Sequence, residues 1–562
     1  GRRGRMTRRS STGRTSDSCD AVVIGAGHNG LVAATHLADA GWDVVVVEAS
    51  TEAGGAVKTD RRLDPEFATD VFSAFYPMTA ASPVMQDLHL EDHGLSWVHA
   101  PKVLTNVRAG APGAVLHRDP HATARDLAIE GTGDGPAWLA LDEQWHRYGT
   151  DLLSALLSPF PPVRAAGRLG WSARADLWDL VRLLVLPVRT MGTELFDGDM
   201  APLLLAGNAL HADVSPEASP SALLGWMLVG LAQTVGFPVP QGGAGAMTDA
   251  LVSRCRTAGG SIRLGTPVER VTVHGGRATG IVTADGVLHA RRAVLAACDA
   301  QMLYGRLIDD RDLPASFMAR MRQFTRAGST VKVNYALSSP VPWSDDRAVG
   351  AGTVHIADSV NELSATAGEI AAGMLPSTPF LLIGQMTTAD PTRSPAGTES
   401  LWAYTHVPQE ITGDAAGQVD VSGRLRGDAL AAFVERMEDR IEAHAPGFRS
   451  TVLARDVQGP DDLEAANASL VGGDISGGTT QLHQQLVFRP VPGLARPETP
   501  ITGLYLASSS AHPGGSVHGA CGANAAAAAL LGARMDRARR VAPLAAAGLG
   551  AATIARQIAT RR

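Results

Sequence analysis

Residues 20–49, DAVVIGAGHNGLVAATHLADAGWDVVVVEA, constrain the fold of this chain more than any other segment. A short apolar run gives way to a glycine-rich turn and an amphipathic stretch, and a second apolar run ends in an acid. The order predicts a βαβ unit, with the turn close to a pyrophosphate and the helix amino-terminus facing its phosphates. The turn follows the pattern GxGxxG, made by Gly25, Gly27, His28, Asn29 and Gly30.

An acid and a second pair of glycines follow this unit. Glu48 ends the second apolar run, where a carboxylate accepts hydrogen bonds from an adenosine ribose and repels a 2′-phosphate. Three glycines and an acid in register argue against a tightly packed unit that binds no nucleotide. The sequence therefore predicts a dinucleotide site that also includes Ala49, Gly54, Gly55 and Ala56.

Four later stretches support a family resemblance: PVPQGGAGAMTDAL (238–251), DPTRSPAGTESLWAYTHVP (390–408), FRPVPG (488–493) and LYLASSSAHPGGSVHGACGANAA (504–526). With GAGHNGLVAA, they resemble the phytoene dehydrogenase-related FAD-dependent oxidoreductases over roughly residues 18–532. That group includes carotenoid desaturases, desaturase-like ketolases and pyridine nucleotide-disulphide oxidoreductase domain-containing proteins. The resemblance implies FAD as cofactor, and oxidation or desaturation of an apolar, isoprenoid- or carotenoid-like substrate by hydride transfer to flavin N5.

The predicted fold class is α/β. We expect a discontinuous Rossmann-type FAD-binding domain, like those of glutathione reductase and amine oxidases, together with an α+β substrate domain. The FAD-binding domain is predicted over residues 18–80, 238–305 and 495–532, and the substrate domain over 81–237 and 306–494. Residues 1–17 are predicted to be a disordered basic leader, and residues 533–562 a basic, alanine-rich tail. Within the substrate domain we expect a glycine-rich connector (110–137), helices between 139 and 232, and strands at 330–336, 380–385 and 401–407.

The resemblance also places residues around the cofactor. The backbone of Gly515, Ser516 and Val517 is expected at the flavin edge, before a helix of small side chains over 519–530. The positive amino-terminal end of such a helix stabilises an anionic reduced flavin. Val268 is expected beside the adenine. The family usually has a glycine-rich turn where this chain has three serines (508–510), so hydroxyls are expected near the ribityl phosphate.

Candidate catalytic residues are few. Lys332 is a charged residue in an apolar, alternating run, with Val331 and Val333 on the opposite side. The related amine oxidases carry at this place a lysine that reaches flavin N5 through a water, with a tryptophan downstream, here Trp343. The alternative is a lysine on the exposed face of a strand. Weaker candidates, which in most proteins are ordinary core or surface residues, are His211, Asp213, His355 and His406.

Composition excludes several other classes. The four cysteines form no CxxC and no metal-ligand spacing, so we expect neither a metal site nor a redox dithiol, and a reducing cytoplasm is the default. The net charge is −7 although residues 1–16 carry six arginines and residues 531–562 seven, so the body is acidic and no nucleic-acid partner is expected. No uninterrupted apolar run reaches the roughly 20 residues of a bilayer span. The tail from Arg534 is expected either to touch an anionic membrane or to form a solvated helix.

No second GxGxxG unit follows a strand, so we expect no built-in NAD(P)H site. Reoxidation of the flavin is then assigned to dioxygen, a quinone or another carrier. Two alternatives remain open at this point. One is a flavin amine oxidase, supported by Lys332 but weakened by an aromatic content of only 5%. The other is a non-catalytic binding or regulatory protein on the same fold. The oligomeric state is left open.

Overall fold

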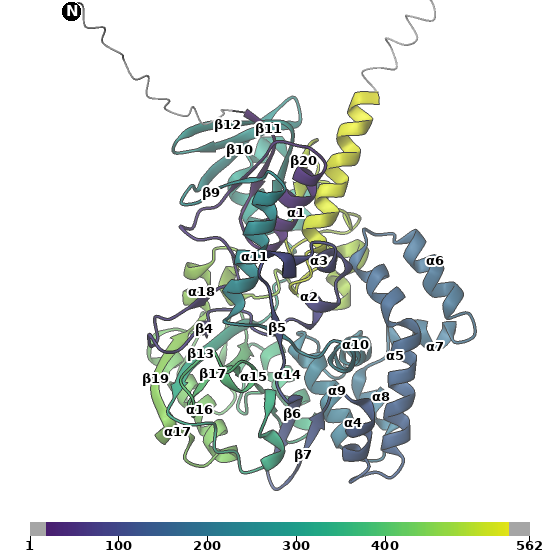
Figure 1. Ribbon diagram of the computed structural model, residues 1–562, viewed down its shortest axis with the longest axis vertical. Coiled ribbons are helices and arrows are strands. Elements are labelled where there is room, and N and C mark those ends of the chain that lie inside the picture. Colours follow the sequence, from purple (N-terminus) through teal and green to yellow (C-terminus); the bar gives the residue numbers. More distant parts are fainter. Residues whose placement is uncertain (1–17, 539–562) are drawn as a thin grey trace, which may run out of the picture.

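The computed structural model describes residues 18–538 and is organised around two large β-sheets (Figure 1). The predicted leader, and residues 539–562 of the predicted tail, lie outside the described residues. The first sheet lies in the upper part of Figure 1, and the second lies below it beside a group of helices.

Parallel strands form the centre of the first sheet. β1 (Ser18–Ile24) lies between β12 (Gly286–Ala296) and β2 (Val44–Val47) and runs parallel to both. The valines of β2 are buried, as the apolar runs in the sequence predict. Further out are β9 (Ser261–Arg263) beside β2, β20 (Leu504–Leu506) beside β12, and the antiparallel strands β11 (Arg277–Thr283) and β10 (Val268–His274).

Two helices cover one face of this sheet. α1 (His28–Asp39) packs against α11 (Ala244–Thr257), and both contribute to an apolar cluster with β1 and β2. A helix over residues 520–538 joins the same cluster through its small alanines. This helix continues to residue 538, past the end at residue 530 that the sequence predicts. The strands of this sheet thus come from segments that are widely separated along the chain. The predicted domain boundaries themselves stay a prediction.

The second sheet is mixed. In spatial order its strands are β19 (Val452–Gln458), β13 (Ser329–Leu337), β17 (Glu399–Val407), β16 (Leu381–Gln385), β14 (Ala351–Ile356), β6 (Lys102–Arg108) and β7 (Ala111–Leu116). α16 (Gly427–His444) packs on one face over a cluster of aliphatic side chains. On the opposite face, side chains of β6, β7, β16 and β17 join the apolar cluster of the remaining helices.

The expected connector over residues 110–137 is wrong. This stretch contains β7, α4 (Pro120–Leu127) and the start of α5 (Asp134–Leu157). Its glycines misled the interpretation because they sit at the ends of elements: Gly110 has a φ of 69° in the turn between β6 and β7. The three strands expected at 330–336, 380–385 and 401–407 are confirmed as β13, β16 and β17.

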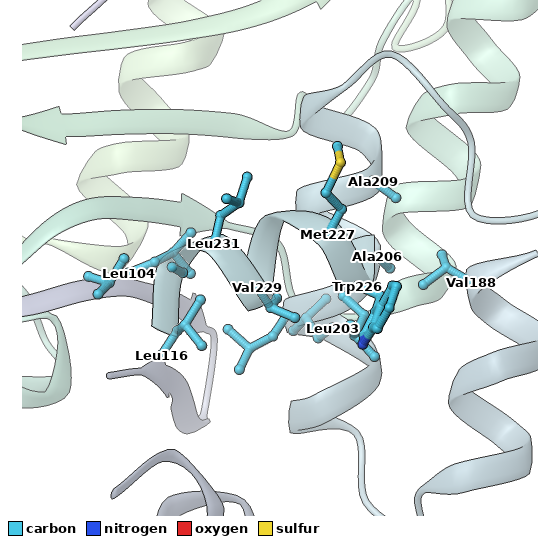
Figure 2. Close-up of a cluster of buried hydrophobic side chains, with 14 of the residues drawn as sticks. Leu104, Leu116, Val188, Leu203, Ala206, Ala209, Trp226, Met227, Val229 and Leu231 are labelled. Atoms are coloured by element: carbon cyan, nitrogen blue, oxygen red, sulfur yellow. The ribbon is translucent and has the colours of Figure 1, made fainter. Parts of the chain in front are cut away.

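A helical layer packs beside the second sheet. Its members are α5, α6 (Val163–Ser172), α7 (Leu177–Leu183), α8 (Val188–Leu195), α9 (Met200–His211) and α10 (Ser221–Thr234). α9 and α10 are buried nearly all round, and their side chains join those of β6 and β7 in one aliphatic core (Figure 2). Trp226 anchors this core, with its indole N–H donating to the Leu141 carbonyl oxygen (3.1 Å).

The other elements are short or lie at the periphery: β3 (Thr59–Asp60), β4 (Thr69–Asp70), α2 (Pro77–Ala81), α3 (Pro83–Gln86), β5 (Trp97–Val98), β8 (Val239–Pro240), α12 (Ala300–Met302), α13 (Ala315–Met321), α14 (Val360–Ala371), β15 (Met374–Leu375), α15 (Met386–Ala389), β18 (Gly413–Asp414), α17 (Phe448–Thr451) and α18 (Pro460–Ala466). Between residues 18 and 538, no helix has the length and apolar character that a membrane span requires.

Candidate active site

The glycine turn after β1 has the shape of a phosphate cradle. Gly25 has a φ of 98°, and its N–H donates to the Val47 carbonyl oxygen (2.8 Å) at the end of β2. A Cβ at Gly30 would lie 2.0 Å from the Gly25 carbonyl oxygen, so only glycine lets α1 pack this close. Gly27 precedes α1 and supplies no side-chain cap. The N–H groups of the first helical turn are therefore left to a ligand.

The acid at the end of β2 is held firmly in place. Glu48 Oε2 accepts a hydrogen bond from the Ala26 N–H (2.7 Å), and Oε1 accepts one from the Ser50 N–H (2.8 Å). Its backbone carbonyl accepts from the Thr266 N–H (2.8 Å), which brings the start of β10, with Val268, beside the acid. The carboxylate keeps lone pairs for a ribose.

The second glycine pair lies beside the first turn. Gly54 forms a β-bridge with Gly27, and a Cβ at Gly27 would meet only the Gly55 Cα, at 3.8 Å. Gly54 and Gly55 have φ values of 119° and 58°, which favour glycine. The two loops together leave backbone without side chains on both sides of the cradle. They also contain the remaining predicted residues of this end, Ala49 and Ala56.

The C-terminal motif packs directly against the same turn, so the structure brings together motifs that are almost 500 residues apart. The ring of His28 lies against the Ser516 backbone, and burial lowers the pKa of His28 to about 4. A Cβ at Gly522 would meet the Asn29 carbonyl oxygen at 2.0 Å. The small residues of the C-terminal helix therefore allow a close approach to the start of α1.

The three predicted flavin-edge residues occupy one loop. Gly515 packs against the backbone of Ser476, where a Cβ would come within 2.8 Å of the carbonyl oxygen. Ser516 has a φ of 87°, unusual for a residue other than glycine. The Val517 carbonyl accepts a hydrogen bond from the Thr79 hydroxyl of α2. The loop is thus fixed from both sides.

Sequence reasoning did not assign a role to Arg489, which organises this loop. Its side chain is fully buried and donates to the carbonyl oxygens of Thr479 (2.9 Å), Gly477 (2.9 Å) and Ser509 (3.0 Å). Burial lowers its pKa to about 10. Arg489 belongs to the FRPVPG stretch that carries the resemblance, which was the available signal.

The serine turn is also engaged within the protein. The Ser510 hydroxyl donates to Asp299 Oδ2 (3.1 Å) and accepts from the Ala300 N–H (3.2 Å). Asp299 in turn forms a two-pronged ion pair with Arg326 (2.7 and 2.8 Å). Ser510 therefore ties the first sheet to the loop before β13.

Lys332 is buried, which rules out the alternative of a lysine on the exposed face of a strand. It is 4% exposed, and its ammonium donates to the carbonyl oxygens of Asp70 (2.5 Å) and Phe72 (3.1 Å). Burial lowers its pKa to about 8, while the Asp70 carboxylate acts in the opposite direction. Val331 and Val333 face the aliphatic cluster on the other side of the sheet, as expected. The predicted contact of Lys332 with flavin N5 stays a prediction.

The tryptophan beside Lys332 differs from the expected one. Trp343 lies in the cluster on the far face of the sheet, where its indole N–H donates to Gln385 Oε1 (3.0 Å). Instead, the Lys332 ammonium lies 5.9 Å from the ring centroid of Trp402. Trp402 packs against Tyr404 (centroids 5.6 Å apart) and Phe75 (6.0 Å). Trp402 was part of a quoted motif, but strand pairing is needed to place it.

A buried ion cluster holds the segment that binds Lys332. Arg393 is 0% exposed and pairs with Asp70 (2.8 Å) and Asp390 (2.9 Å). Its backbone carbonyl accepts from the Ala68 N–H (2.7 Å). Because the Asp70 carboxylate is used by Arg393, only the backbone of that residue is left for the lysine. Arg393 is thus a positioning residue for Lys332.

The weak histidine candidates gather on the same sheet face. Tyr404 lies opposite Lys332 in the β13–β17 ladder, and its ring is 5.6 Å from that of His406 and 6.1 Å from that of His211. His355 is 6.0 Å from His211. Burial lowers the pKa of His211 and His406 to about 4 and lowers that of His355 well below its ordinary value, so the three rings are neutral at pH 7. His355 hydrogen-bonds through neither ring nitrogen, and His406 Nε2 also lacks a partner, within residues 18–538.

A cleft of about 560 Å³ adjoins this group. His406 and Phe380 line it, as do Asp213, predicted as a weak candidate, Arg326 and Ile370 of α14. Burial raises the pKa of Asp213 to about 6. An apolar molecule with a polar group fits such a lining, and within the described residues no cluster of side chains is suited to a metal ion.

Comparison with known proteins identifies the family. Residues 23–109 match the model of an NAD(P)-binding Rossmann-like domain, and residues 186–408 match that of flavin containing amine oxidoreductases. The chain is 31% identical to mouse pyridine nucleotide-disulfide oxidoreductase domain-containing protein 2, over 92% of this chain and 94% of that protein. It is 25% identical to a zeta-carotene-forming phytoene desaturase of Myxococcus xanthus, with 88% and 90% coverage. The chain belongs to the phytoene dehydrogenase-related family of FAD-dependent oxidoreductases.

A solved structure agrees on the fold. Putrescine oxidase bound to putrescine superposes with a TM-score of 0.57 at 18% identity, covering 91% of this chain and 98% of that one. The predicted α/β class with a Rossmann-type FAD-binding domain is confirmed, as is FAD as cofactor. The chain is a flavin-dependent oxidoreductase, and its residues 186–408 are similar to flavin containing amine oxidoreductases.

The residues present fit FAD. The uncapped start of α1, the clearance at Gly27 and the anchored carboxylate of Glu48 suit the pyrophosphate and the adenosine ribose. The orphaned Nε2 of His28, buried under the Ser516 loop, leaves a polar atom for the same ligand. The assignment of individual contacts to each predicted residue stays a prediction.

Proposed function

We propose that this flavoenzyme oxidises or desaturates a neutral, largely apolar substrate of isoprenoid or carotenoid type. The observation that carries the proposal is the uncharged aromatic and histidine lining beside Lys332. Trp402, Tyr404 and His406 occupy alternate positions of β17 and therefore share one face. Lys332, on the neighbouring strand β13, is the charged side chain beside these neutral rings. A phytoene desaturase among the relatives supports the same class of substrate.

An amine substrate is disfavoured by charge. A protonated amine beside Lys332 would meet a second cation, because the lysine is mostly protonated at pH 7. The nearest carboxylate, Asp70, is already paired with Arg393. Amine oxidation is the second candidate, since Phe75, Trp402 and Tyr404 form an aromatic group that accommodates a cation at Trp402.

In the proposed reaction, the FAD held by the α1 turn and Glu48 would supply a hydride acceptor for one substrate carbon. The neighbouring carbon would lose a proton to the solvent, to be taken up with the electron pair by the final acceptor, and a double bond would form. The protein positions the substrate and excludes water, which is where most of the rate enhancement in such a site arises. Lys332 fixes the loop of Asp70 and Phe72 over the sheet, and the neutral His406 and Tyr404 orient a polar group of the substrate. Dioxygen or a quinone then takes up the electron pair.

Anaerobic reduction of the bound flavin tests this function. The purified holoenzyme is mixed with isoprenoid or polyene substrates in detergent and, in parallel, with putrescine and other amines, while the flavin absorbance is followed. We expect bleaching by the neutral substrates. Bleaching by amines alone would establish the second candidate and refute the first. Hydrogen peroxide release after admission of air distinguishes dioxygen from a quinone as acceptor.

A further inference from the structure

The α6–α7 hairpin presents an apolar face to solvent. On α7 and the turn that follows, five apolar residues recur at helical spacing and form one stripe. They are exposed by 37% at Leu177, 80% at Trp178, 42% at Val181, 37% at Leu184 and 56% at Val185. An amphipathic helix ordinarily turns such a stripe to the core, whereas here it points away from the protein.

The neighbouring helix extends this surface. Trp171 at the end of α6 is 73% exposed, and Val163 at its start is equally exposed. Between residues 163 and 185 only Ala165, Ala173 and Leu183 are buried. Figure 1 shows α6 and α7 standing out beyond α5. Scattered apolar residues are normal on a surface, but a contiguous patch with two tryptophans marks an interaction site.

The charges around the patch are mainly positive. Arg168 pairs with Asp151 (3.3 Å) and Arg182 with Glu194 (2.6 Å), both on neighbouring parts of the chain. Arg164 and Arg174 have no carboxylate partner within the described residues. The Arg174 guanidinium lies over the Trp171 ring, 5.2 Å from its centroid. Within residues 18–538, two arginines without a carboxylate partner therefore flank the exposed tryptophans, against one acid of α7 without an ion-pair partner, Asp179.

We propose that the α6–α7 hairpin docks on the surface of an anionic lipid bilayer. Tryptophan, with an apolar ring and one N–H, is enriched where hydrocarbon meets headgroups, and arginines at the rim complement anionic lipids. A second copy of the chain fits less well, since pairing two such patches would enclose Arg164 and Arg174 of both copies, four arginines without a carboxylate partner in the described part of their own chain, in one interface. This placement differs from the sequence-based expectation, which considered membrane contact for the C-terminal tail, as one of two alternatives.

The base of the hairpin leads to the flavin-edge loop. The Ser158 carbonyl accepts a hydrogen bond from His512 Nε2 (2.9 Å), and Leu157 accepts one from Asn524 Nδ2 (3.0 Å). The Phe160 ring packs edge-on to His512 (6.5 Å). His512 lies three residues before Gly515. One short segment therefore connects the docking face to the predicted flavin-edge loop.

Vesicle sedimentation of the full-length holoenzyme tests the proposal without any substrate. We compare phosphatidylcholine vesicles with and without phosphatidylglycerol. We expect binding to the anionic vesicles that weakens with salt. The Trp171→Ser/Trp178→Ser variant should partition onto the vesicles about tenfold less than the wild type. The Arg164→Gln/Arg174→Gln variant should bind anionic vesicles about fivefold more weakly for each arginine removed, with no change on phosphatidylcholine alone. Flavin content and thermal unfolding verify that the variants fold.

The matched control is Ile129→Ser/Leu453→Ser, which removes two apolar side chains of 58% and 60% exposure outside the hairpin. It should bind vesicles like the wild type. The proposal is overturned if the wild type ignores anionic vesicles, or if both hairpin variants bind as it does. A concentration-dependent dimer that disappears in the tryptophan variant would assign the patch to a second copy instead.

Discussion

Burial of Lys332 has a measurable thermodynamic consequence. Its pKa falls from the ordinary 10.5 to about 8. Between these values the unfolded chain holds a proton that the folded protein has lost, so the free energy of unfolding rises with pH in this window. At 1.36 kcal/mol per pH unit, the gain is about 2–3 kcal/mol between pH 8 and 10. Solvent screening reduces it little, because the side chain is 4% exposed.

Lys332→Met removes this titration while keeping most of the side-chain volume. Guanidinium unfolding of wild type and variant is measured at about pH 7 and pH 10, and only the difference between the two proteins is used, so that other titrating groups cancel. The wild type should gain about 2–3 kcal/mol relative to Lys332→Met on going to the higher pH. The control is Lys58→Met, which removes the same group from a half-exposed position.

The same variant tests the predicted role at the flavin. The photoreduced holoenzyme is mixed with dioxygen at several pH values. If Lys332 contacts the flavin region, the reoxidation rate of the wild type should change around pH 8, and this step should vanish in Lys332→Met while FAD content stays normal. In the unfolding experiment, an equal pH dependence of wild type and Lys332→Met would show that burial does not lower the pKa of Lys332. Identical reoxidation profiles would confine it to a structural role.

Three further predictions concern the cofactor site and its frame. Glu48→Ala should weaken FAD binding about tenfold or more, because a charge-assisted hydrogen bond is worth about 1.5–3 kcal/mol. Release of flavin fluorescence measures the affinity, and Glu48→Gln, which keeps an acceptor for one backbone N–H, should lose less of it. Unchanged affinity in both variants would mean that the Glu48 carboxylate does not contact the ribose. Arg393→Met should lower stability by about 3–5 kcal/mol, because it leaves Asp70 and Asp390 buried without their cation; a wild-type denaturation midpoint would contradict the ion cluster. Acid precipitation should release all of the FAD, since the Cys521 thiol is buried and its pKa is raised to about 11, which disfavours the thiolate needed for a covalent link; flavin retained in the pellet would refute this.

The nucleotide half of the site was readable from the sequence because its requirements are local. Gly25, Gly30 and Glu48 act through backbone conformation, close packing and the end of a strand, all encoded within one βαβ unit. The strands of the second sheet were also predictable, since buried β-strands appear as short apolar runs. The glycines of residues 110–137 were misread because a glycine that ends an element looks the same as one within a loop.

The substrate half could not be read in the same way. Which tryptophan lies beside Lys332 depends on the pairing of β13 with β17, a long-range contact that one strand does not specify. Arg393 and Arg489 look like surface arginines in sequence, yet both are fully buried because their partners arrive from distant segments. Burial of these cations becomes evident only when the tertiary structure is known.

The low aromatic content shows why composition is a poor guide to a site. Aromatic residues make up 5% of the chain, which seemed to disfavour an aromatic cage. The fold nevertheless concentrates Phe75, Trp402 and Tyr404 next to Lys332, so aromaticity alone does not separate the two candidate reactions. Charge separates them better, because Asp70 is consumed by Arg393 and the neighbouring histidines are neutral. On the proposed function, a cationic substrate would be repelled by the protonated Lys332, whereas a neutral one would not.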